Sequence, residues 1–178
     1  MKIVISGGAG TGKSSIADAV AKELKLKRYS TGDMQREFAK EKGISINELS
    51  KLEREDPKID LEIDRRSKSL GEREDDFIID SRLAAFFIPD SLKVYLKTDI
   101  DERVRRRMLQ KRDTESFSDP VKARDAILER DEVDRERWKK LYGFDYMDED
   151  SYDLIVDTTI ISIKEAADLI VDAARSLF

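Results

Sequence analysis

One stretch near the start of the chain has the residue types and spacing of a phosphate-binding loop. Residues 7–14 read Gly-Gly-Ala-Gly-Thr-Gly-Lys-Ser and match the pattern G-x-x-x-x-G-K-[ST] in full. Glycines let successive backbone N–H groups point at phosphate oxygens, and the start of a following helix adds positive potential. Lys13 then places its charge on the β- and γ-phosphates, and the Ser14 hydroxyl suits Mg²⁺. The predicted triphosphate site comprises Gly7, Gly8, Ala9, Gly10, Thr11, Gly12, Lys13, Ser14 and Ser15.

A second group of charged residues is spaced to meet a small acceptor. Asp33 and Arg36 follow a candidate strand and share a face if their segment is a helix, so that Arg36 would clamp an acceptor phosphate. The apolar run 77–79 ends in Asp80, which would orient Mg²⁺ through water, and Arg82 would project toward the same cleft. The alternatives are a capped helix start with an exposed ion pair, and a strand end in solvent.

The most highly charged run covers residues 129–137. If it is helical, Arg130, Asp134 and Arg137 lie along one face at spacings of four and three. Arginines that arrive on a closing lid stabilise the charge that spreads over oxygens during phosphoryl transfer. Lys13, Arg130 and Arg137 are therefore the candidate catalytic residues. The alternative is a solvated helix stabilised by pairs such as Asp131 with Arg135.

The composition narrows the chemistry that is open to the chain. Its 178 residues include no histidine and no cysteine, which excludes imidazole acid–base catalysis, thiolate nucleophiles and disulfides. With 34 basic and 39 acidic residues the net charge is -5, which argues against a nucleic-acid partner. No apolar stretch is long enough to cross a bilayer, so we expect a cytoplasmic protein without a membrane partner.

Short apolar runs alternate with helical patterns along the chain. The runs at residues 2–6, 77–80, 92–96 and 152–156 are typical of buried strands, and residues 27–30 form a weaker fifth candidate. Strands alternating with helices predict an α/β fold with a mostly parallel five-stranded sheet between two helical layers. We expect one domain over residues 1–178, with charged segments at 36–72 and 111–141 that form flaps over the site.

Several helix ends can be placed from their capping residues. Ser45 with Glu48 and Ser162 with Glu165 fit the S-x-x-E capping box. Another helix is expected to start at residues 56–57 and to close at Gly71, and a helix is expected from about Asp33. The last helix should pack on the sheet through one stripe, namely Ile163, Ala166, Ala167, Ile170, Ala173, Ala174 and Leu177.

Taken together, these motifs resemble the cytidylate kinases, a group of nucleoside monophosphate kinases within the P-loop proteins. The resemblance covers nearly the whole chain, and the short length and residues 56–66 are similar to the archaeal members. The resemblance also rests on the phosphate loop, on Thr31-Gly32-Asp33-x-x-Arg36, and on the segments 89–96, 102–110 and 130–137. Two positions depart from the family, because Ser81 and Ala85 stand where glycine is frequent.

The resemblance implies transfer of the γ-phosphate of ATP to CMP, and also to dCMP, by a monomer that uses Mg²⁺. It implies that Arg130 and Arg137 contact phosphates as the lid closes, and that Asp134 meets the acceptor's ribose. Arg36 and Arg82 would hold the CMP phosphate, and Arg103 or Arg107 would pack against adenine. Cytosine offers an exocyclic amine donor beside two acceptors, so a carboxylate can accept from the amine while an arginine donates to the acceptors. Asp64 and Arg65 are the candidates for these two roles. The implied CMP site is Asp33, Arg36, Asp64, Arg65, Arg82, Asp134 and Arg137.

Two other functions remain open from the sequence. The chain could be a kinase for another acceptor, such as UMP, AMP or shikimate. It could also be a regulator that binds a nucleotide without transferring phosphate, although it has no guanine-reading N-K-x-D motif.

Overall fold

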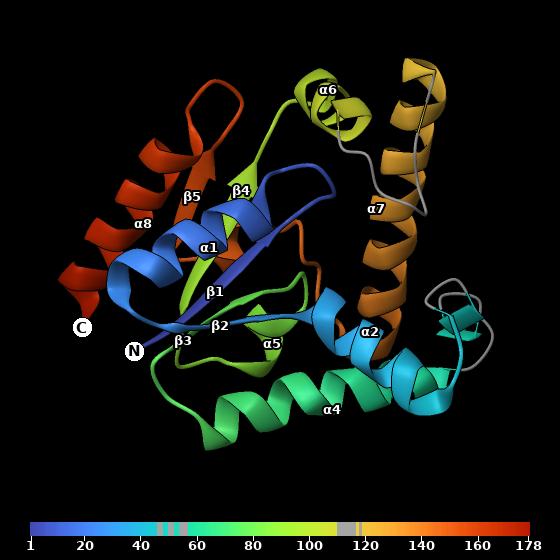
Figure 1. Cartoon of the computed structure of the whole chain (residues 1–178), viewed down its shortest axis with the longest axis horizontal. Helices are drawn as coiled ribbons and strands as arrows, with labels where there is room; N and C mark the ends of the chain where they lie inside the picture. Colours follow the sequence, from blue (N-terminus) through green and yellow to red (C-terminus); the bar gives the residue numbers. More distant parts are fainter. Residues whose placement is uncertain (46–47, 50–51, 54–56, 110–116, 118) are drawn as a thin grey trace.

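A five-stranded parallel sheet forms the centre of the molecule in the computed structural model (Figure 1). The structure describes residues 1–45, 48–49, 52–53, 57–109, 117 and 119–178. The strands lie in the order β2-β3-β1-β4-β5, and the described pairings are all parallel. Their bounds are β1 Lys2–Gly7, β2 Lys27–Ser30, β3 Phe77–Asp80, β4 Leu92–Lys97 and β5 Leu154–Asp157. The predicted α/β class is confirmed, and the weak candidate at 27–30 is a strand.

The carboxyl ends of three strands bring the charged segments together. The pairing register places Ile5 of β1 beside Asp80 of β3, and Ser30 of β2 beside the same Asp80. Chain segments that follow these strands therefore leave the sheet at one edge. In open parallel sheets this edge is where ligands bind.

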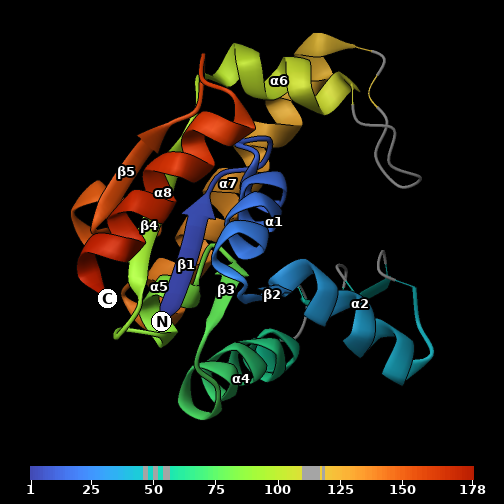
Figure 2. The same cartoon turned by 60° about the vertical axis from the view of Figure 1, so that its left-hand side comes forward.

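Helices cover both faces of the sheet, as Figure 2 shows. On one face, α1 (Lys13–Leu24) and α8 (Ile163–Leu177) pack small and branched side chains against β1 and β4. On the other face lie α5 (Ala84–Phe87) and α7 (Pro120–Tyr142), and Trp138 of α7 is buried against Tyr95 of β4. The three-layer arrangement is confirmed.

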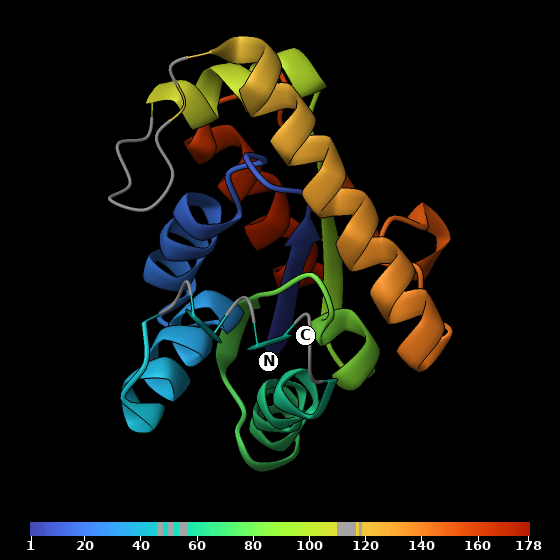
Figure 3. The same ribbon diagram turned by 90° about the vertical axis from the view of Figure 1, so that its right-hand side faces the viewer.

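Two further helical parts lie beyond the sheet. The helices α2 (Thr31–Lys42) and α4 (Pro57–Arg73) form a part that we call the insert. It has a small apolar core of its own, made of Phe38, Ala39, Leu49 and Ile63. The helix α6 (Ile100–Leu109) packs on the first half of α7, and Figure 3 shows α7 running from α6 past the sheet toward α5. A short 3-10 helix, η1, covers Glu149–Ser151. The predicted flaps thus correspond to α2 with α4 and to α7, while residues 46–47, 50–51, 54–56, 111–116 and 118 lie outside the described residues.

Some element ends differ from the sequence prediction. The helix expected from about Asp33 starts at Thr31, because the side chain of Ser30 caps it by accepting a hydrogen bond from Asp33 N at 3.1 Å. The strand expected at 152–156 is displaced to 154–157, since Asp153 turns its carboxylate to Lys93 N at 2.8 Å instead. Local apolar patterns do not reveal such side-chain contacts with distant segments.

Both predicted capping boxes have the expected hydrogen bonds. Glu165 N donates to Ser162 Oγ at 3.1 Å and Ser162 N to Glu165 at 2.8 Å, which fixes the start of α8. Ser45 and Glu48 exchange the same pair of bonds, although the helix that follows them is only partly described. In the stripe of α8, Ala166, Ala167, Ile170 and Ala174 are buried and Ala173 is half-buried, but Ile163 and Leu177 at its ends are exposed.

Gly71 does not end its helix, contrary to the sequence prediction, because α4 continues to Arg73. A Cβ at Gly71 would lie 2.8 Å from Cγ1 of Ile88, a side chain that is 1% exposed in the core beneath β3. Glycine is therefore present for close packing of α4 on α5, and not as a helix terminator.

The substitution Gly71→Ala tests this explanation. Alanine normally stabilises a helix interior by about 1 kcal/mol relative to glycine. Here overpacking against Ile88 should outweigh that gain and lower the free energy of unfolding by about 1–3 kcal/mol. Denaturant unfolding measures the change, with Lys68→Ala at an exposed α4 position as the control. A more stable Gly71→Ala variant would contradict the packing role.

Candidate functional site

The phosphate loop lies between β1 and α1, as its sequence pattern requires. Gly10 and Gly12 have φ values of 84° and 91°, a left-handed conformation that other residues rarely adopt. The Thr11 hydroxyl donates to Gly8 O at 3.0 Å and holds the turn closed. Two of the glycines are thus required by the path of the backbone into the helix.

Lys13 is directed back into the loop. Its Nζ donates to Gly7 O and Gly8 O, each at 2.7 Å. Its pKa is lowered to about 7, mainly by burial and also by the charge of Arg82, with Asp80 partly opposing the shift. The ammonium group is therefore poorly compensated until anionic phosphates reach it.

The hydroxyl of Ser14 and the carboxylate of Asp80 are the oxygen donors predicted for Mg²⁺. Ser14 is exposed in the first turn of α1, and Asp80 is buried at the end of β3. Asp80 accepts a bond from Arg28 at 2.7 Å, so it is not the solvated strand end of the alternative interpretation. Within the described ranges no group of three or more acidic side chains is placed to hold a metal ion. This donor set suits a magnesium ion bound mainly by substrate phosphates and water.

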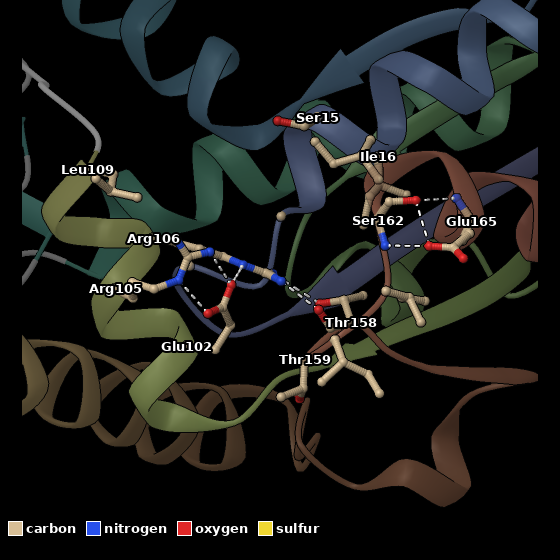
Figure 4. A pocket seen from close by; sticks show the side chains of 15 residues that line it. Ser15, Ile16, Glu102, Arg105, Arg106, Leu109, Thr158, Thr159, Ser162 and Glu165 are labelled. Atoms are coloured by element: carbon tan, nitrogen blue, oxygen red, sulfur yellow. Dashed lines mark hydrogen bonds and ion pairs between the residues drawn. The ribbon is translucent and has the colours of Figure 1, made fainter.

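A cavity of about 640 Å³ opens beside the loop (Figure 4). Gly10, Gly12 and Ser15 form one side, α6 forms another, and the segment 158–165 after β5 forms the third. Ile160 is 93% exposed at this cavity, and Leu109 also lines it. The cavity has room and apolar surface for the nucleoside part of a bound triphosphate.

The arginines that line this cavity, Arg105 and Arg106, are not the two predicted. Arg106 donates to Thr158 O at 2.5 Å, and Glu102 accepts from it at 2.7 Å. Arg103 instead donates to Ala9 O at 2.7 Å, and Arg107 is buried within α6. Neither Arg103 nor Arg107 lines the cavity. The E-R-x-x-x-R spacing does not reveal this difference, because one turn of α6 faces the loop, the cavity and α7 in succession.

Four charged side chains link α7 to the sheet edge. Arg82 is buried, and its guanidinium contacts both Asp131 and Asp134. Asp134 also accepts from Arg137 at 3.2 Å, so Arg82, Asp134 and Arg137 are brought together as predicted. Arg130 lies one turn earlier and is exposed, yet it is close enough to lower the pKa of Lys13. The run 129–137 is helical and faces the site.

Asp33 and Arg36 form the exposed ion pair that was the alternative interpretation of their segment. Asp33 also accepts from Arg28 at 2.8 Å, and Arg28 bonds Asp80 on the neighbouring strand. The pair therefore lies at the carboxyl end of β2, and Arg28 connects it to Asp80 at the end of β3. Nothing in the local pattern around Arg28 marks it as the residue that joins these two carboxylates.

Asp64 and Arg65 do not converge on one site. Asp64 accepts from the Tyr142 hydroxyl of α7 at 2.6 Å, and burial raises its pKa. Arg65 is exposed and its nearest carboxylate is Glu62, at 3.8 Å. Successive residues of a helix point in different directions, which is why the two side chains have different neighbours here.

A second polar pair in the insert is absent from the sequence prediction. Gln35 of α2 donates to Glu53 at 2.9 Å, and burial raises the pKa of Glu53 while Arg137 and Arg130 lower it. Because α2, residue 53 and α7 are far apart in the chain, no spacing rule connects them.

A glycine-rich loop closing on a lysine, at the carboxyl edge of a parallel sheet, defines a P-loop nucleotide-binding protein with the fold of the small-molecule kinases. Residues 2–160 match the model of the cytidylate kinase-like family, and the chain belongs to this family. It is 40% identical to a cytidylate kinase of Aeropyrum pernix over 97% of this chain and 98% of that protein. It is 38% identical to one of Desulfurococcus amylolyticus over 96% of this chain and 90% of the relative.

Solved structures support the fold. A shikimate kinase of Bacteroides thetaiotaomicron superimposes with a TM-score of 0.70 over 98% of both chains, at 15% identity. An uncharacterised protein of Eubacterium ventriosum gives a TM-score of 0.75 over 99% of both chains, at 19% identity. A search of the described helices finds none with the length and apolar character of a membrane span.

The lowered pKa of Lys13 predicts proton uptake on nucleotide binding. At pH 8.5 the amine of the empty protein is mostly neutral, and phosphate anions should raise its pKa toward or above the usual 10.5. Binding of ADP should then take up close to one proton per molecule. The uptake should vanish near pH 6, where Lys13 is already charged.

Calorimetry in buffers of different ionisation enthalpy measures this uptake. Lys13→Arg is the matched control, because arginine stays charged throughout this range. A binding heat that is the same in all buffers at pH 8.5 for the unmodified protein would contradict the prediction.

Proposed function

We propose that this protein transfers the γ-phosphate of ATP to CMP, and also to dCMP, forming ADP and the nucleoside diphosphate. The observation that carries the proposal is the presence of two separate cationic groups at one sheet edge. One is the loop with Lys13, and the other is the buried Arg82 with Arg137 on α7. The curated relatives named cytidylate kinase, which match over nearly their whole length, support CMP as the acceptor.

ATP would bind with its phosphates in the loop and its nucleoside in the adjoining cavity. Backbone N–H groups, Lys13 and the N-terminus of α1 meet the phosphate oxygens. Adenine would lie between Arg106 and the apolar side chains of Leu109 and Ile160. Arg103 reaches Ala9 and is therefore assigned to the phosphates instead of adenine. Mg²⁺, bound through Ser14 and through water on Asp80, would neutralise charge on the β- and γ-phosphates.

The acceptor would bind between the insert and α7. Arg82 and Arg36 would hold the CMP phosphate, and Asp134 the ribose. On the opposite wall, Asp64 offers a carboxylate for the exocyclic amine of cytosine, and Gln35 with Glu53 offers a further donor and acceptor. Arg65 points elsewhere and has no part in this assignment.

Transfer needs no general base, because the attacking CMP phosphate oxygen is already anionic near neutral pH. That oxygen forms a bond to the γ-phosphorus as the bond from the γ-phosphorus to the bridging oxygen of ADP breaks. Lys13, Arg130 and Arg137 would stabilise the charge on the transferred group. A chain without histidine or cysteine can carry out this reaction by positioning and charge alone.

An acceptor panel tests the proposal. ADP formation from ATP and Mg²⁺ is measured with CMP, dCMP, UMP, AMP and shikimate at equal concentration. CMP and dCMP should give the highest kcat/KM. Stimulation by shikimate or AMP alone would assign the site to another acceptor. Nucleotide binding without stimulation by any acceptor would favour the non-catalytic regulator.

Arg137→Ala should lower kcat for CMP phosphorylation about 10²–10³-fold, because a charge-stabilising donor is lost from the transition state. Arg135→Ala is the matched control, since Arg135 lies on the same helix and pairs with Asp145 at 2.8 Å, away from the site. Steady-state kinetics and thermal unfolding are measured for both. If Arg137→Ala changed only thermal stability, the solvated-helix interpretation of α7 would be correct.

A further inference from the structure

One carboxylate on α7 reaches into the phosphate loop of the empty protein. Asp131 is 3% exposed, and its Oδ1 accepts a hydrogen bond from Ala9 N at 3.4 Å. Its Oδ2 lies 2.7 Å from the point where a Cβ on Gly8 would be. An anion thus already sits against one backbone N–H group of the loop, that of Ala9, where this kind of loop holds phosphate oxygens.

The same carboxylate holds one arginine from each side of the site. Oδ2 pairs with Arg103, which also donates to Ala9 O in the loop. Oδ1 lies 3.2 Å from a guanidinium nitrogen of Arg82, the arginine at the end of β3. Asp134 is the other carboxylate on Arg82, and the structure records no contact between it and the loop.

We propose that Asp131 is a positioning residue that occupies the phosphate place of the empty loop and leaves it when ATP binds. The two anions cannot share Ala9 N–H, and their like charges repel at this distance. Departure of Asp131 releases Arg103 to the ATP phosphates and one side of Arg82 to the acceptor phosphate. Occupancy of the loop is thereby coupled to the affinity for the acceptor.

The competition predicts that loss of the charge tightens nucleotide binding. Asp131→Asn keeps the shape of the side chain but removes the competing anion, so the Kd for ADP without acceptor should fall about tenfold. A merely structural role predicts the opposite, because loss of a buried ion-pair partner would loosen the loop and weaken ADP binding. The direction of the change separates the two roles.

Asp134→Asn is the matched control for this measurement. It removes the other carboxylate from Arg82 without touching the loop, so its Kd for ADP should stay within about twofold of the unmodified protein. Equal tightening in both variants would attribute the effect to general charge and overturn the proposal, as would unchanged or weaker ADP binding in Asp131→Asn. A crystal structure with bound ADP gives a second test that needs no variant. Asp131 still bonded to Ala9 N beside the nucleotide would overturn the proposal.

The coupling is measured separately with the acceptor. In the unmodified protein ADP should tighten the binding of CMP, and in Asp131→Asn this tightening should shrink severalfold because Arg82 is already released. This part rests on the proposed function, whereas the ADP measurement needs no acceptor. Failure of the acceptor panel and failure of the Asp131 proposal are therefore distinguishable.

Discussion

A group of cations must be kept close together in this protein while no phosphate is bound. Lys13 bonds the loop carbonyls, while Arg82 and Arg103 meet at Asp131 beside the loop, and both arginines are largely removed from water. Unpaired buried charges are costly, so each must be neutralised by the protein itself. Asp131 and Asp134 on α7 neutralise the arginines by pairing with them. Lys13 bonds loop carbonyls instead of a carboxylate, and its pKa is lowered.

The fold serves this constraint by bringing distant segments to one edge of the sheet. Parallel strands aligned in register place the ends of β1, β2 and β3 side by side, so the segment that follows each strand brings a charged side chain to this edge. The carboxylates come from α7, which packs on the opposite face through Trp138 and is anchored there by an apolar cluster. The same helix, α7, therefore supplies the carboxylates of the site and part of the apolar core.

The sequence predicts those parts that depend on local rules. The phosphate loop, the alternation of strand and helix and the caps at Ser162 and Ser45 follow from backbone conformation and periodicity over a few residues. Sequence reasoning fails where a contact between distant segments determines the role of a residue. Gly71 looks like a helix end but accommodates Ile88, and Asp64 and Arg65 look like a pair but point to different neighbours.

The candidate site divides in the same way. Arg82, Asp134 and Arg137 were predicted from their charge and spacing, and the structure brings their side chains together. The choice among the arginines of α6 could not be made, since Arg103 and Arg106 differ only in which neighbour lies across from them. Arg28 and Asp131 were missed as site residues because the partners that connect them to the site, Asp80 and Ala9, are 52 and 122 residues away.

The place of Trp138 has a practical consequence. It is the chain's single tryptophan, it is buried on α7, and the guanidinium carbon of Arg137 lies 5.2 Å from its ring centroid. A charged group over the indole face alters the energy of its excited state. The indole emission of the unlabelled protein therefore comes from one residue, located where α7 joins the site, and a displacement of Arg137 should be visible as a change in that emission.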